Sequence, residues 1–121
     1  VTVLAWSTMV GKALQASEEL EKQGVSVEVI DARTLVPLDE ATLLASVAKT
    51  GRLVTVEEGR KRGGVGAEIA ATVMEKAFGS LKAPVVRVAA PNIPVPSGPA
   101  AEAMHVPSVP SIIGGVRTAL A

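Results

Sequence analysis

The residues of this chain with the most obvious chemical potential form a basic, glycine-rich stretch. Residues 57–68 contain four glycines and three consecutive bases. Backbone N–H groups at the start of a helix, together with the helix dipole, attract phosphate or carboxylate. The stretch is therefore predicted to be an anion-binding loop or, as the favoured interpretation, a loop that turns sharply or packs against a neighbouring subunit. The residues assigned to it are Gly59, Arg60, Arg62, Gly63, Gly64 and Gly66.

The spacing within this stretch argues against a nucleotide site. Gly64 and Gly66 are followed by Ile69, where a dinucleotide-binding fingerprint requires its third glycine. The Walker pattern of P-loop proteins is also absent. The loop thus lacks the specific signature that would identify a nucleotide as its ligand.

Three acidic residues end two of the expected strands. Asp31, Glu57 and Glu58 would lie at the carboxyl edge of an open sheet, where such folds bind ligands. A pair of them could hold a divalent cation, but ion pairing of Glu57 or Glu58 with Arg60 or Arg62 is the favoured interpretation. A phospho-receiver domain is excluded because the first strand ends in tryptophan and serine instead of acids. No metal site is expected.

The chain has a single histidine, His105, and no cysteine. Every mechanism based on imidazole would have to use His105, and thiolate catalysis is excluded. No serine stands in a nucleophile-elbow context. We expect a surface or packing role for His105 and no catalytic or cofactor-binding residue in this segment.

Four short runs rich in β-branched residues predict the strands that must position these groups. They cover residues 1–6, 25–31, 53–57 and 85–89. Helical patterns separate them: one capped by Ser7 or Thr8 and ending at Gly24, one over 39–51, one over 64–80 and a last one over 111–120. The first is expected to bury Leu14 and the third Phe78. Six of the eight prolines fall within 91–110, which predicts an extended connection there.

This alternation of strands and helices predicts an α/β fold in three layers. Parallel strands joined by right-handed crossovers place helices on both faces of the sheet. We expect a mainly parallel sheet of four strands in the order 2-1-3-4, within a single domain over residues 1–121. Since the chain opens directly on a strand without Met, it is expected to be a fragment of a longer protein.

Composition excludes several classes of partner. Twelve basic and twelve acidic residues cancel, so long-range steering toward a polyanion is not expected. Aromatic residues make up 2% of the chain, too few for base stacking on nucleic acid. No apolar run approaches the roughly 20 residues of a membrane span. Neither nucleic acid nor membrane is a predicted partner.

Six strings, in their order and spacing, carry a resemblance to a known family. They are VEVIDARTLVPLD (27–39), KTGRLV (49–54), VEEG (56–59), GGVGAEIA (63–70), APVVRV (83–88) and PVP (94–96). Together they resemble the C-terminal domain of the beta subunit of thiamine-diphosphate-dependent 2-oxoacid dehydrogenases, of the pyruvate, branched-chain or acetoin type. The wider group includes transketolases.

The resemblance implies a domain that helps to assemble a larger enzyme. Its expected partners are an alpha subunit, a second beta subunit and an acyltransferase core, and its expected place is the cytoplasm, or the mitochondrial matrix in a eukaryote. It implies thiamine diphosphate and magnesium bound by other domains of the intact enzyme. The catalytic glutamate and histidine of the family lie upstream, so this segment alone is not expected to be catalytically competent. The resemblance also implies an antiparallel edge strand ahead of Val1.

Two positions depart from the family pattern. Lys82 stands where many pyruvate-type relatives have an aspartate that pairs with a basic residue of the acyltransferase, and charge reversal there would weaken that contact. Ser97 and Gly98 stand where an aromatic residue is common. The alternatives to a dehydrogenase beta subunit are the C-terminal domain of a transketolase-like enzyme and a free-standing module that binds a small anion or nucleotide.

Overall fold

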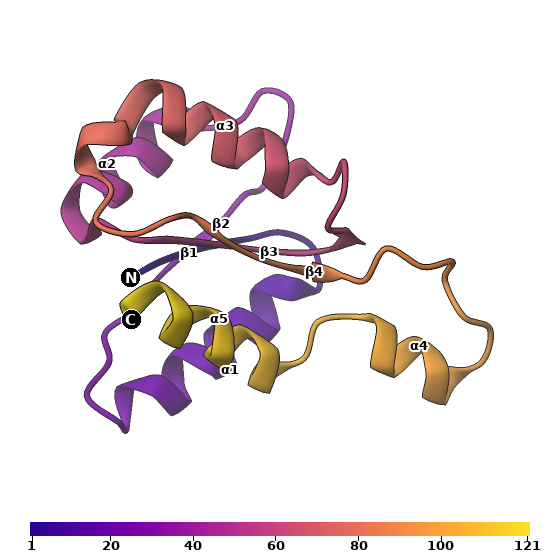
Figure 1. Ribbon diagram of the computed structural model, residues 1–121. Helices are drawn as coiled ribbons and strands as arrows, with labels where there is room; N and C mark the ends of the chain where they lie inside the picture. The colour runs from indigo at the N-terminus through magenta and orange to yellow at the C-terminus, as the bar shows by residue number, and fades with distance from the viewer.

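The computed structural model describes all residues, 1–121, and contains a central sheet between two layers of helices (Figure 1). The strands are β1 (Thr2–Ala5), β2 (Glu28–Asp31), β3 (Leu53–Arg60) and β4 (Val86–Ala90). All neighbouring pairs are parallel, and their order is β2-β1-β3-β4. The predicted fold class and strand order are confirmed.

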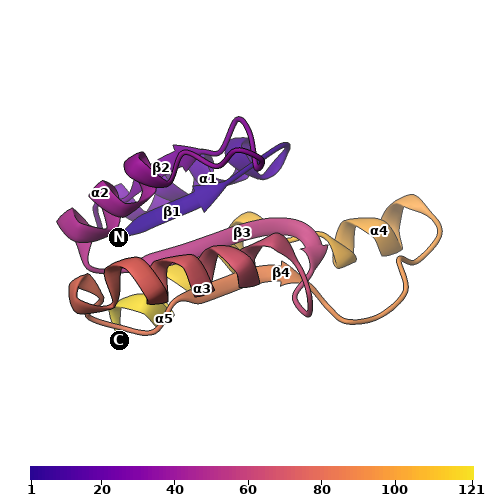
Figure 2. The same cartoon turned by 90° about the horizontal axis from the view of Figure 1, so that it is seen from above.

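Two helices cover each face of this sheet. On one side lie α1 (Met9–Glu21) and α5 (Val109–Leu120), and on the other lie α2 (Glu40–Thr50) and α3 (Val65–Ala77), which continues into a short 3₁₀ turn over Phe78–Ser80. A further short helix, α4 (Pro99–His105), projects past the end of the sheet (Figure 2). No helix combines the length and the apolar character needed to cross a bilayer.

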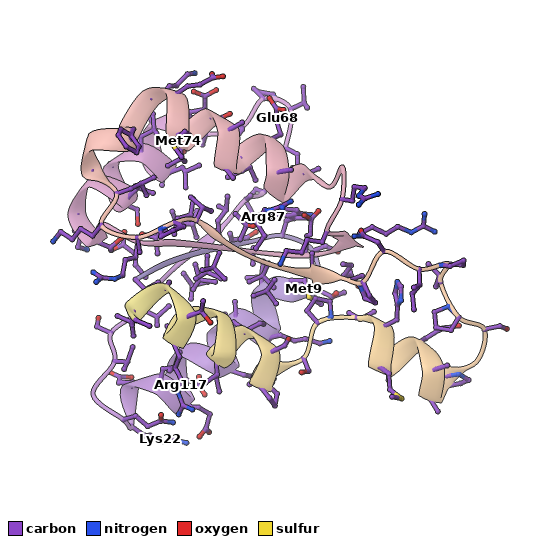
Figure 3. All side chains as sticks on the ribbon, in the orientation of Figure 1. Met9, Lys22, Glu68, Met74, Arg87 and Arg117 are labelled. Carbon is purple, nitrogen blue, oxygen red and sulfur yellow. The ribbon has the colours of Figure 1, made fainter.

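The alternation of side chains along the strands divides the core into two clusters. Val54 and Val56 face α1 and α5, whereas Leu53 faces α2 and α3. Met9 of α1, labelled in Figure 3, is fully buried against the first face. Each fully buried side chain of this size contributes roughly 1.5–3 kcal/mol through removal from water. The two clusters hold the helices on the sheet.

Local capping sets the helix boundaries. Asp39 caps α2 by accepting a hydrogen bond from the Thr42 amide (3.0 Å), and Gly51 ends α2 with φ of 74°. The last helix begins at Val109 and not at Ser111, because Ser108 and Ser111 form a reciprocal capping box. Pro110 is tolerated in the first turn, where no N–H is needed for the helical ladder.

Three sequence predictions about burial and conformation were wrong. Leu14 is 50% exposed, because the buried stripe of α1 runs through Met9, Ala13, Ala16 and Leu20. Phe78 is 67% exposed, since α3 tightens into a 3₁₀ turn at this residue and the side chain leaves the buried face. The connection over 91–110 is not extended throughout: α4 forms within it, with proline at the start of the helix where the missing N–H costs nothing.

Candidate functional site

The glycine-rich stretch consists of the end of β3, the turn that follows it and the start of α3, and we name it the Glu57 turn (residues 57–66). A register shift between Val56 and Arg60 interrupts the pairing of β3 with β4 at this point. Glu57 follows Thr55 on the face of β3 that looks toward α3, and it is only 3% exposed. The nearly buried carboxylate of Glu57 therefore lies at the start of α3.

The carboxylate of Glu57 caps α3 from a distance of several residues along the chain. Its Oε2 accepts a hydrogen bond from the Val65 amide at 3.1 Å, and its Oε1 accepts one from the Gly66 amide at 3.0 Å. The Ala67 amide donates to the Gly64 carbonyl oxygen at 3.0 Å. Negative charge at this end of the helix dipole is stabilising, and hydrogen bonds to a charged acceptor are strong. The N–H groups that an external anion would use therefore already have an internal carboxylate as partner.

Two glycines of the turn are required by the closeness of this carboxylate. A Cβ atom on Gly64 would lie 2.6 Å from Glu57 Oε1 and 2.5 Å from the Arg60 carbonyl oxygen. A Cβ on Gly66 would lie 2.7 Å from both Glu57 Oε1 and Thr55 Oγ1. Gly63 adopts a φ of 71°, which favours glycine. These contacts explain the glycines by packing around Glu57, in line with the favoured interpretation of a sharply turning loop.

The expected ion pairs between the acids and bases of this turn do not form. The salt bridges of the chain are Lys22–Glu19, Arg33–Asp31, Lys49–Glu28 and Lys76–Glu40. The Glu57 carboxylate instead accepts hydrogen bonds from backbone amides, because α3 begins within reach of it. Arg60 and Arg62 stay exposed, and the Arg62 amide donates to Asn92 Oδ1 at 2.9 Å.

The structure separates the acids that could have shared a cation. Asp31 ends β2, two strands away from β3, and its carboxylate lies 3.7 Å from Arg33. No group of three or more His, Asp or Glu side chains is arranged to hold a metal. Hydrogen bonds from Thr42, mainly from its hydroxyl and to a smaller extent from its amide, lower the pKa of Asp39. A hydrogen bond from Lys49, and to a smaller extent one from Ser46, lowers the pKa of Glu28. These carboxylates act as helix cap and surface ion-pair partner.

A second region leaves the sheet beside the Glu57 turn. We name residues 91–107, which include α4, the proline arm. Ile93 and Val95 are 53% and 66% exposed, and Met104 is 87% exposed. His105, by contrast, is only 7% exposed, and its Nδ1 has no hydrogen-bond partner. A groove of about 510 Å³ runs between the arm, β4 and the start of α5.

Lys82 lies at the opposite edge of the sheet, before β4 begins. Its amide donates to the Gly51 carbonyl oxygen at 2.8 Å, and its aliphatic stem covers Gly51. The side chain as a whole is exposed. The predicted docking residue and the predicted loop therefore do not form one surface.

Sequence reasoning missed the role of Glu57. A signal was present, since a glutamate at a strand end precedes a pair of glycines and a third glycine at the start of a helix. Glycines at the first positions of a helix are unfavourable unless another group approaches the backbone closely. That combination predicts an internal group close to the backbone, and the structure identifies this group as Glu57.

Comparison with known proteins places this geometry in context. The model of the transketolase C-terminal domain family matches residues 1–112. A subunit named pyruvate dehydrogenase E1 component subunit beta-1, mitochondrial, from Oryza sativa subsp. japonica is 51% identical over 119 residues, covering 98% of this chain and 32% of that protein. The pyruvate dehydrogenase E1 component subunit beta of Staphylococcus epidermidis is 47% identical, covering 99% of this chain and 37% of that protein.

Two further matches widen the range of relatives. The acetoin:2,6-dichlorophenolindophenol oxidoreductase subunit beta of Cupriavidus necator is 42% identical over 97% of this chain and 35% of that protein. A solved structure described as a split gene transketolase, inactive beta4 tetramer, superposes with a TM-score of 0.84 at 31% identity, covering 98% of this chain and 37% of that one. The chain spans about a third of the length of the curated relatives that it matches.

Proposed function

The chain belongs to the family of transketolase C-terminal domains, and from this we propose that it is a single such domain acting as the assembly and docking part of a dehydrogenase beta subunit. The intact enzyme would decarboxylate a 2-oxoacid with thiamine diphosphate and pass the acyl group to a lipoyl acyltransferase. The observation that carries the proposal is the 51% identity over 98% of the chain to a pyruvate dehydrogenase beta subunit. The parallel sheet and the four covering helices are consistent with it.

The residues of this segment do not fit a thiamine diphosphate site. The amides at the start of α3, which could have held a diphosphate, donate to Glu57, and the acidic residues at the strand ends are not gathered around a metal position. We therefore assign thiamine diphosphate and magnesium to other domains of the intact enzyme. No step of the reaction is assigned to a side chain of this chain.

The proposed role of the Glu57 turn is an interface with the other subunits. Its inner residues are fixed by Glu57, while Arg60 and Arg62 stand exposed on a rigid base without acidic partners. Such pre-ordered charges suit a contact with an acidic surface of the alpha subunit or of a second beta subunit. Lys82, at the other edge, would face the acyltransferase core, where it favours an acidic counterpart.

The cellular compartment of the intact enzyme depends on the kind of organism that produces it. Relatives named as mitochondrial occur in plants and other relatives occur in bacteria. We place the intact enzyme in the cytoplasm of a prokaryote, with the mitochondrial matrix as the eukaryotic counterpart.

Reconstitution tests the proposed activity. The full-length protein that contains this chain is produced together with its candidate alpha subunit, and reduction of an artificial electron acceptor is followed with pyruvate, a branched-chain 2-oxoacid or acetoin. The expected result is turnover that depends on thiamine diphosphate and on both subunits. Transfer of a two-carbon ketol group between sugar phosphates, without acceptor reduction, would instead support the transketolase alternative, which the TM-score of 0.84 to a split-gene transketolase favours.

Charge reversal tests the proposed interface. Changing both Arg60 and Arg62 to glutamate is expected to weaken subunit assembly, measured by sedimentation of the mixed subunits. Arg33→Glu, at an exposed arginine at the end of β2, serves as the matched control. Equal assembly of the double variant and the control would contradict an interface at this turn.

A further inference from the structure

The groove beside the proline arm has a distinctive lining, whose meaning does not depend on the dehydrogenase assignment. It has a volume of about 510 Å³ and is lined by thirteen residues from the arm, the Glu57 turn, β4 and the first turns of α5. None of the thirteen is acidic, although the chain as a whole has equal numbers of acids and bases. The groove is therefore a local concentration of donors and positive charge.

His105 supplies an unusual donor to this groove. The side chain is 7% exposed, and its enclosed Nδ1 has neither a donor nor an acceptor nearby. Of the two neutral tautomers, the one with the proton on Nε2 avoids an orphaned N–H at Nδ1. Nε2 is not enclosed and makes no hydrogen bond within the chain, so a proton on Nε2 is free to bind a ligand in the groove that His105 lines.

The start of α5 also contributes hydrogen-bond donors and positive charge to the groove. Ser108 and Ser111 both line the groove, and the positive end of the α5 dipole lies at Ser108. Ser108 Oγ accepts the Ser111 amide hydrogen bond (3.3 Å) and keeps its own hydroxyl proton free to donate. The donors on this side of the groove are thus the nearly buried His105 imidazole and the exposed Ser108 hydroxyl.

Two cations at the edge add charge without closing the groove. Because Val88 faces α5, Arg87 (labelled in Figure 3) points to the other face of the sheet, and its Nη1 donates to the Lys61 carbonyl oxygen at 2.7 Å. Neither Arg87 nor Lys61 takes part in a salt bridge. Both residues border the groove, Arg87 from the far face of β4, and their positive charge attracts an anion over several ångströms.

We propose that this groove is a binding site for a small oxyanion, a carboxylate or phosphate group, whose oxygen accepts hydrogen bonds from His105 and Ser108. Val88, Met104 and Val106 give the remaining wall an apolar character. An aliphatic carboxylate is accordingly favoured over inorganic phosphate. The site differs from the Glu57 turn, where an internal carboxylate already occupies the amides.

Calorimetric titration of the full-length protein with sodium butyrate and with inorganic phosphate, at constant ionic strength, tests the proposal. His105→Leu should weaken binding about tenfold, the effect of one buried hydrogen bond. Lys61→Gln should weaken it less, and Lys22→Gln, at the far end of α1, should leave it unchanged. Tighter binding of butyrate supports an aliphatic carboxylate, and binding of phosphate alone supports a phosphate group.

The outcome does not depend on the folding of one variant. Lys61 is exposed, so Lys61→Gln removes charge without disturbing the core. If neither probe binds to the unmodified protein, or if both the Lys61 and His105 variants titrate as the unmodified protein does, the groove is not an anion site. Loss of enzyme activity plays no part in this test, so failure here leaves the dehydrogenase proposal intact.

Discussion

The Glu57 turn and the proline arm leave neighbouring strands at the same edge of the sheet, yet their polar groups are treated in opposite ways. The two regions touch where the Arg62 amide donates to Asn92 Oδ1, next to the point where the Lys61 amide donates to the carbonyl oxygen of Ala90, the last residue of β4. In the turn, a buried carboxylate and two helix amides satisfy one another. In the arm, a buried imidazole nitrogen has no partner and three large apolar side chains face solvent.

This contrast shows that glycine density alone does not reveal a ligand site. The glycines of the turn make room for Glu57, an internal group, and the resulting cap is a structural device. The arm, which has few conventional motif residues, contains the unpartnered His105 nitrogen beside an open groove, whereas the other unpartnered buried atom, Thr55 Oγ1, is enclosed beneath the Glu57 turn. Buried polar groups without partners are rare in folded proteins, and of the two in this chain only His105 borders a groove that a ligand could enter.

The largest effect should come from filling the space beside Glu57. Gly66→Ala places a Cβ atom 2.7 Å from Glu57 Oε1 and from Thr55 Oγ1, so either the helix or the carboxylate must move. We expect a loss of about 3 kcal/mol in the free energy of unfolding, from overpacking and weakened hydrogen bonds together. Urea denaturation of the purified protein measures it.

Gly114→Ala is the matched control for this substitution. Gly114 lies in α5, and a Cβ there meets no atom within 4 Å. Alanine should stabilise the helix by roughly 0.5–1 kcal/mol. If both substitutions changed the free energy of unfolding equally, the space beside Glu57 would not be tightly packed. The contrast between the turn and the arm would then not hold.

A smaller effect should follow from changing the chemistry of the cap and keeping its shape. Glu57→Gln leaves one oxygen to accept and turns an amide NH₂ toward a helix N–H, so one buried donor loses its partner. We expect a loss of about 2 kcal/mol in the free energy of unfolding. The neighbouring Glu58→Gln, at an exposed site, should change it by less than about 0.5 kcal/mol. Similar losses in both variants would show that the carboxylate cap contributes nothing specific.

A helix cap made by a carboxylate should weaken in acid, whereas a helix cap made by a serine should not. The hydrogen bonds from Thr42 lower the folded-state pKa of Asp39, so its ionised form stabilises α2 above the unfolded value of about 3.9 and this contribution is lost as the pH falls through the lowered pKa. The Ser108 cap that follows the arm does not titrate. Amide exchange between pH 5 and acid should therefore show a falling protection factor for the Thr42 amide and a steadier one for Ser111. A parallel fall at both amides would point to global unfolding instead.

Much of this fold could be predicted because it rests on local periodicity. Short apolar runs rich in β-branched residues located β1 and β3, and cap residues such as Asp39 and Gly51 located the ends of α2. Strand order followed from the way doubly wound sheets of this size commonly reverse beside the first strand.

The site was harder to predict because it depends on contacts between distant segments. Glu57 reaches amides eight and nine residues away, and nothing in its own neighbourhood distinguishes it from Glu58. The burial of His105 depends on how α4 folds back toward β4 and α5. Phe78 was misplaced for a related reason, since a change from α to 3₁₀ geometry turns one residue away from the core.

The smallest effect on stability, and the most informative one about the arm, should come from Met104. It is 87% exposed, so Met104→Ser should change the free energy of unfolding by less than about 0.5 kcal/mol. Val73→Ser, at a fully buried position of α3, should by comparison cost several times more, because it places a hydroxyl in an apolar cluster. If Met104→Ser nevertheless weakens butyrate binding in calorimetry, its side chain acts on a ligand and not on the fold. A large loss of stability in Met104→Ser would instead make the arm a structural element like the Glu57 turn, and the contrast between the two regions would no longer hold.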